Sequence, residues 1–139
     1  MTNEIMNAMS ISAMGMKVQG TRIRVITENI ANADTTALTP GGDPYRRQII
    51  TFKNQMDKTL GLDTVRVQGI YEDNKTPFLN KYMPDHPAAD PNGYVKMPNV
   101  NALIEVADVR EAQRSYEANL GMIEQGRQMI QRTIDLLRV

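Results

Sequence analysis

The single histidine of this chain, His86, stands in a proline-rich segment with Asp85 and Asp90 close by. An imidazole beside carboxylates is the residue set of a general base or of a metal ligand. A metal site needs further ligands, and the sequence contains no cysteine and no second histidine. No serine stands in a nucleophile motif. We therefore interpret His86 as a solvated loop residue, and we predict no catalytic residue and no metal ligand.

Pairs of carboxylates are a second source of chemistry. Glu72 with Asp73, or Asp85 with Asp90, could flank a glycosidic bond as acid and base, as in a cell-wall hydrolase. Such a pair is weak evidence in a chain with sixteen acidic residues. The Gly41-Gly42 dipeptide lacks the flanking pattern of a phosphate or dinucleotide loop, so we expect no cofactor. A wall hydrolase that uses His86 or these acids stays open as a third hypothesis.

Composition excludes several other classes of protein. The hydrophobic content of 41% is too high for a disordered chain. Sixteen basic residues cancel sixteen acidic ones, so no overall field attracts nucleic acid. No run approaches the roughly 18 to 20 apolar residues that span a bilayer. The first sixteen residues carry no lysine or arginine, unlike a cleaved secretory signal. We predict a folded protein that neither binds nucleic acid nor spans a membrane.

Two long helices must position whatever function the chain has. Apolar residues recur with heptad spacing over 3–31 and again over 102–138, which predicts helices that pair as a coiled-coil-like hairpin. The amino-terminal seam contains Met6, Met9, Ala13, Met16, Gly20, Ile23, Thr27 and Ile30. The carboxy-terminal seam contains Ala102, Val106, Val109, Gln113, Tyr116, Leu120, Ile123, Arg127, Ile130, Ile134 and Leu137.

The first predicted helix has a second apolar line, and the second helix has a charge in its seam. The second line contains Ile11, Met14, Val18 and Val25. A two-helix hairpin covers one side only, so this line contacts either the middle segment or another protein molecule, and we favour another molecule. If Arg127 pairs with an acidic residue across an interface, it sets the register of the two packed helices. Otherwise the aliphatic part of its side chain packs on the helix and its charged group reaches solvent.

The middle of the chain predicts a small β region. Strands are expected at 45–52, 64–71 and 94–97, with a helical turn or a loop at 54–59. Five prolines in 77–98 predict a proline-rich loop with little regular structure, and Asn101 is the expected N-cap of the final helix. The fold class is mainly α with a β insertion. Its domains are 1–38, helix and signature loop of a helical core; 39–98, the β-rich middle; and 99–139, the second core helix.

Sequence motifs at both ends match a known family. The first runs from Glu28 to Thr36 (ENIANADTT) and continues as PGGDPYRR to Arg47. The second combines GYV at 93–95 with MPNVN at 97–101, and it ends at Asn119 with the spacing Ala112, Arg114, Tyr116, Glu117, Ala118, Asn119. In order and spacing, the two motifs resemble those of the bacterial flagellar basal-body rod protein family, and in particular its proximal rod subunits.

The resemblance implies a structural role without catalysis. It implies a subunit of the proximal rod, whose terminal helices assemble into a helical tube that transmits torque across the periplasm. It also implies export by the flagellar type III apparatus without a cleaved signal peptide. The implied partners are copies of itself, other rod proteins, the membrane-ring base of the flagellum and the export apparatus.

The candidate site is therefore an assembly interface made of seam and motif residues. The alternative from another class is a soluble coiled-coil adaptor or a secretion-linked binding module, which would form a small closed oligomer. The expected interface residues are Met9, Met16, Ile23, Asn29, Ile30, Asn32, Tyr45, Arg46, Asn99, Asn101, Tyr116, Asn119, Leu120, Ile123, Arg127, Ile130, Ile134 and Leu137.

Overall fold

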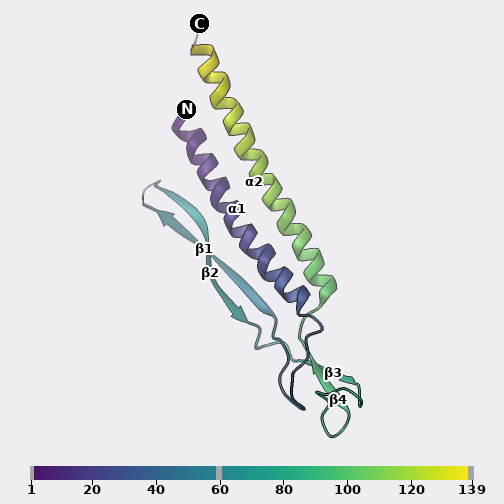
Figure 1. Cartoon of the computed structure of the whole chain (residues 1–139). Coiled ribbons are helices and arrows are strands. Elements are labelled where there is room, and N and C mark those ends of the chain that lie inside the picture. Colours follow the sequence, from purple (N-terminus) through teal and green to yellow (C-terminus); the bar gives the residue numbers. More distant parts are fainter. Residues whose placement is uncertain (1, 59–60, 138–139) are drawn as a thin grey trace. The chain divides into compact units, whose positions relative to one another are not determined.

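The chain begins and ends with a long helix, and a small β region lies between the two helices in sequence (Figure 1). The computed structural model describes residues 2–58 and 61–137. The elements are α1 (Thr2–Ala31), β1 (Gln48–Asp57), β2 (Leu62–Glu72), β3 (Leu79–Tyr82), β4 (Tyr94–Met97) and α2 (Ala102–Leu137). This confirms a mainly α fold with a β insertion. No helix among the described residues is long and apolar enough to cross a membrane.

Local polar residues begin and end the helices where the sequence predicts. The Asn101 side-chain oxygen accepts hydrogen bonds from the backbone N–H groups of Leu103 and Ile104, at 3.1 and 3.4 Å. This is the N-cap geometry, and it confirms the prediction for Asn101. At the end of α1 the side chain of Asn32 donates to the carbonyl of Glu28 at 2.9 Å. The predicted helix end at Arg138 lies outside the described residues.

The ribbon formed by β1 and β2 is longer than predicted. Residues 54–57 belong to β1, so the expectation of a turn or loop there is wrong for these residues. Apart from Met56 their side chains are polar, but cross-strand contacts hold the backbone extended. Thr64 donates to the carbonyl of Gln55 at 2.9 Å, and Arg66 pairs with Asp57 at 3.3 Å. The turn needs Gly61, whose φ is +64°.

The proline-rich segment 77–98 contains a β-hairpin, which corrects the prediction of little regular structure. β4 has the predicted bounds, and β3 was not predicted. The strands pair antiparallel from Leu79 opposite Met97 to Tyr82 opposite Tyr94. The prolines lie outside β3 and do not interrupt its hydrogen-bond ladder. The high proline content of the segment therefore did not exclude a strand there. The Tyr82 and Tyr94 rings stack edge to face, with centroids 5.3 Å apart.

The chain divides into two compact units. The first contains residues 1–23, 51–69 and 110–139, and the second contains 24–50 and 70–109. In the first unit, α1 lies beside α2 on one side and beside the ribbon on another (Figure 1). Met14 and Val18 of α1 and Val65 and Val67 of β2 line a hollow of about 390 Å³ there.

The second apolar line of α1 is largely covered within the chain. Val18 is buried in the first unit and Val25 in the second. Our preference for another molecule as the cover is therefore wrong for these two residues, because the middle segment reaches farther than its length suggested. Ile11, on the same line, remains exposed.

Candidate assembly site

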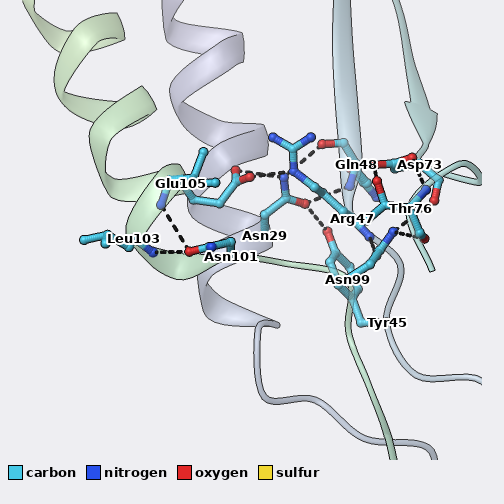
Figure 2. A network of polar contacts seen from close by, with 11 residues as sticks. Asn29, Tyr45, Arg47, Gln48, Asp73, Thr76, Asn99, Asn101, Leu103 and Glu105 are labelled. Atoms are coloured by element: carbon cyan, nitrogen blue, oxygen red, sulfur yellow. Dashed lines mark hydrogen bonds and ion pairs between the residues drawn. The ribbon is translucent and has the colours of Figure 1, made fainter. Parts of the chain in front are cut away.

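A buried polar network occupies the second unit, and Asn29 in the last turns of α1 is its centre (Figure 2). The Asn29 side-chain oxygen accepts hydrogen bonds from the Tyr45 hydroxyl and the Gln48 backbone N–H, both at 2.9 Å. Its amide nitrogen donates to the Gln48 carbonyl at 2.9 Å and to Glu105 Oε2 at 3.2 Å. Both donors and the acceptor oxygen of this buried amide are therefore used, as burial requires.

Glu105 brings a carboxylate from the first turn of α2 into the same network. Its side chain is only 1% exposed. Oε1 accepts a hydrogen bond from Arg47 Nε at 2.6 Å, while Oε2 accepts from Asn29. A buried carboxylate is tolerated because a cation pairs with it, and the amino-terminal end of a helix also favours negative charge.

Asn99 and Asp73 extend the network to the middle segment. The Asn99 oxygen accepts from the Arg47 backbone N–H at 2.8 Å, and its amide donates to the carbonyls of Asp73 and Thr76 at 3.0 and 3.1 Å. The Asp73 carboxylate accepts from the Thr76 hydroxyl and from the N–H groups of Thr76 and Lys75. These hydrogen bonds, the Thr76 hydroxyl first, lower the pKa of Asp73. The network thus joins four separate stretches of the chain.

Two neighbouring side chains from the first motif have different surroundings. Burial, and then the nearby charges of Glu28 and Glu105, raise the pKa of Tyr45, so its hydroxyl stays a donor at neutral pH. Arg46 lies over the ring of Phe78, 4.2 Å from its centroid, in a cation–π contact.

The structure thus brings motif residues from the two ends of the chain together. Of the predicted interface residues, Asn29, Tyr45 and Asn99 belong to the network, whereas Asn32 and Asn101 cap helices. Sequence reasoning did not place Arg47, Asp73 or Glu105 in the site. The available signal was an acid in an otherwise apolar first turn, Leu103-Ile104-Glu105-Val106.

In the first unit the two helices approach each other at small and polar residues. Gly15 of α1 faces Asn119 of α2, so closely that a methyl group on Gly15 would lie 2.9 Å from the Asn119 amide nitrogen. Gly126 faces Met9 in the same way, with Met9 Cγ 2.7 Å from the position of such a methyl group. Ala112, Asn119 and Gly126 follow one another at intervals of seven residues, and Ala112 is buried. This stripe has heptad spacing but is not the apolar seam.

The predicted seam residues flank this stripe and stay partly open to solvent. The exposed fraction is 56% for Met6 and 40% for Leu120, and Ile134 and Leu137 are exposed as well. The half-buried seam residues are Met9, Met16, Gly20, Ile23, Ile30, Val109, Tyr116, Ile123 and Ile130, and Asn119 of the stripe, which is a predicted interface residue, is half-buried too.

A groove of about 560 Å³ runs between these flanks within the first unit. Arg127 is exposed in the groove and makes no hydrogen bond or ion pair with any residue that the structure describes. The groove is lined by Met6, Met9, Ser10 and Ala13 of α1 and by Ile123, Arg127 and Ile130 of α2. Its walls therefore consist of predicted seam residues, Arg127 among them, and one serine.

Comparison with known proteins decides which family has these features. Residues 92–136 match the sequence profile of the flagellar basal body rod FlgEFG protein C-terminal family. A flagellar basal-body rod protein FlgC of Agrobacterium fabrum is 52% identical over 131 residues, which is 94% of each chain. This chain belongs to the FlgC family of flagellar basal-body rod proteins. FlgC of Borreliella burgdorferi is 36% identical and covers 96% of this chain and 98% of its own length. FlgC of Salmonella typhimurium is 36% identical, and the match covers 95% of this chain and 97% of the relative's length.

Membership of the FlgC family confirms the function that the motifs predict, a structural subunit of the flagellar basal-body rod. It places the protein in the basal body, and it implies assembly with other components of the rod. The alternative of a soluble adaptor is not favoured.

Proposed function

We propose that this protein builds the proximal rod by taking helices of neighbouring subunits against the apolar flanks of its own helix pair. Repeated without closure, such contacts form a helical tube, which would transmit torque across the periplasm. The protein would act without catalysis.

The proposal rests on the observation that largely different residues of α1 and α2 form the contact between the helices and the groove beside it. Where the helices approach, Gly15 lies against Asn119 and Gly126 lies against Met9, while Met9 and further apolar side chains line a groove beside this contact. A solvent-facing groove with apolar walls gains free energy when an apolar surface covers it. Its two walls come from helices, and a third amphipathic helix fits such a site.

Within the chain, we propose that α1 and α2 pair as a coiled-coil-like hairpin. Three contacts in the first unit support this: Met9 with Gly126, Gly15 with Asn119, and Arg22 with Glu111. From one contact to the next, the residue number rises by about seven on α1 and falls by about seven on α2. Antiparallel order and this step are the marks of heptad packing.

The proposed domains have distinct roles. The helices of 1–38 and 99–139 form the helical core, and the β-rich middle of 39–98 lies between them in sequence. The buried network holds the signature loop to the start of α2, so that Asn29, Tyr45 and Asn99 act by shaping the assembly surface. The seam residues would make the direct contacts with neighbours; on α2 these include Leu120, which is exposed, and Ile123 and Arg127, which line the groove.

The proposed partners are further copies of this chain, other rod proteins, the membrane-ring base and the type III export apparatus. A rod subunit must reach the periplasm, and export by the type III apparatus without a cleaved signal peptide is part of the proposal. The zero net charge supports the proposal that nucleic acid is not a partner.

Leu120→Asp tests the proposal. Leu120 is partly exposed in the single chain, so the variant should fold, with a small loss of stability measured by thermal unfolding. A neighbouring helix would bury the new carboxylate without a partner, at a cost of several kcal/mol. We expect loss of rod incorporation, measured on isolated basal bodies, and loss of swimming. Gln128→Asp, an exposed change on α2 outside the predicted seam, is the matched control. Normal swimming of the Leu120→Asp strain would contradict the proposal.

A further inference from the structure

We infer that the assembly surface is also a site of methionine oxidation, at Met6 in the groove, and that sulfoxide formation there weakens the association of subunits. Met122 and Met129, which are exposed on α2 and do not line the groove, would be oxidised as well. The inference rests on the proposed function, because it concerns the same helices. It adds a chemical modification, with a peroxide as the reagent class.

Exposure separates these three methionines from the others in the helices. The exposed fraction is 56% for Met6 and 52% for Met122 and Met129, whereas Met9, Met14 and Met16 are half-buried. Oxidation of sulfur follows its access to the oxidant. The chain has no cysteine to compete, so the thioethers are its oxidisable sulfur groups. We therefore expect the exposed set to react first.

The reaction is a two-electron oxygen transfer. A lone pair of the thioether sulfur attacks one oxygen of hydrogen peroxide, the O–O bond breaks, and an S–O bond forms. The sulfur is oxidised to the sulfoxide, and the peroxide is reduced and leaves as water. The side chain changes from apolar to strongly polar while its length is retained.

Because Met6 lies in the groove, its oxidation would change the affinity of one subunit for the next. The rest of the groove lining is mostly apolar, namely Met9, Ala13, Ile123 and Ile130, with Ser10 and Arg127 as its polar members. In the free chain water hydrates the sulfoxide, but a helix seated in the groove would remove that water. Burying a polar group without a partner is unfavourable, so association should weaken at least about tenfold. A subunit already packed in the rod would be protected.

Met56 provides a matched control. It is 61% exposed, at least as open as Met6, but it lies on β1 and does not line the groove. Its oxidation should be as fast and should leave helix-mediated association unchanged.

The experiment treats the purified full chain with hydrogen peroxide and measures each methionine by peptide mass spectrometry. Self-association of treated and untreated chain is then compared by sedimentation. We expect oxidation of Met6, Met56, Met122 and Met129 before Met9, Met14 and Met16, and an association constant at least about tenfold lower. Methionine sulfoxide reductase should restore the association. Without any oxidant, Met6→Gln should weaken association, as a polar mimic of the sulfoxide, and Met56→Gln should not.

The outcomes separate this inference from the proposed function. If the untreated chain associates and the chain with a sulfoxide at Met6 associates equally well, the inference fails and the proposed function stands. If Met56→Gln weakens association as much as Met6→Gln, the groove is not the sensitive surface and the inference fails. If the untreated chain never associates and never enters rods, the proposed function fails, and the inference fails with it.

Discussion

The side-chain amide of Asn29, near the end of α1, donates a hydrogen bond to the buried carboxylate of Glu105, in the first turn of α2, over 3.2 Å. The two residues are 76 positions apart in sequence. Their contact ties the end of one terminal helix to the start of the other, and Arg47, the last residue of the first motif, binds the same carboxylate at 2.6 Å. The assembly surface is therefore shaped by a polar network as well as by apolar packing.

Glu105→Gln should destabilise the folded chain by about 3 kcal/mol. Both carboxylate oxygens accept hydrogen bonds, whereas a glutamine offers one oxygen and one N–H group. One of the two donors, on Asn29 or on Arg47, would then face another donor, and the Arg47 charge would lose its partner. Denaturant unfolding of the monomer measures the loss.

Glu111→Gln is the matched control for Glu105→Gln. Glu111 pairs with Arg22 at 3.4 Å, but its side chain is 66% exposed, so its removal should cost less than about 1 kcal/mol. Equal losses for the two variants would show that the burial of Glu105 is not what makes it important.

The stability of the chain should fall in acid because of Asp73. Hydrogen bonds to its ionised form hold the pKa below the usual value of 3.8. A lowered pKa in the folded state means that the stabilisation is complete above about pH 5 and is lost as the pH falls through the folded pKa. Asp73→Asn should reduce stability at pH 7 and flatten the acid part of the stability profile. The exposed Asp85 serves as a control, since Asp85→Asn should leave the profile unchanged.

Two glycines of α2 should respond in opposite directions to alanine. A methyl group at Gly121 meets nothing within 4 Å, so Gly121→Ala should stabilise the monomer by up to about 1 kcal/mol through helix propensity. At Gly126 the methyl group would lie 2.7 Å from Met9 Cγ, and Gly126→Ala should be destabilising by about 1 to 2 kcal/mol. Thermal unfolding of the two variants checks this. Equal stabilisation by both would mean that the helices do not approach closely at Gly126.

Arg127 should matter for assembly and little for folding. It makes no hydrogen bond or ion pair with the part of the chain that the structure describes, so Arg127→Met and Arg127→Glu should each change monomer stability by less than about 0.5 kcal/mol. If its charge pairs with a carboxylate of a neighbouring subunit, rod incorporation should fall from the natural chain to the Met variant and further to the Glu variant. Incorporation of Arg127→Met at or above the natural level would instead show that the charge only reaches solvent.

Much of the architecture was open to prediction from local patterns. The helices over 2–31 and 102–137, the N-cap at Asn101 and the strand at 94–97 depend on periodicity, capping and turn chemistry within a few residues. The strand at 79–82 was missed because it is short and wholly exposed, so no burial pattern indicates it. Its identity as a strand depends on the partner β4, whose paired residues lie 12 to 18 positions farther along the chain, from Tyr82 opposite Tyr94 to Leu79 opposite Met97.

The sequence by itself therefore determined most of the helices and strands, their order and the protein family. The family can be identified in this way because the motifs of a flagellar rod protein are runs of neighbouring residues. Which line of each helix faces inward was decided only by the tertiary structure. Periodicity showed the apolar seam through Met9 and Leu120. Of these, Met9 lies against Gly126 where the helices approach, whereas Leu120 stays exposed, and Gly15 and Asn119, which are outside the seam, form a second close approach. Small residues let two backbones approach, and larger apolar residues are then held to the flanks. Burial of Asn29 and Glu105 likewise depends on partners far away in sequence, which only the folded chain brings together.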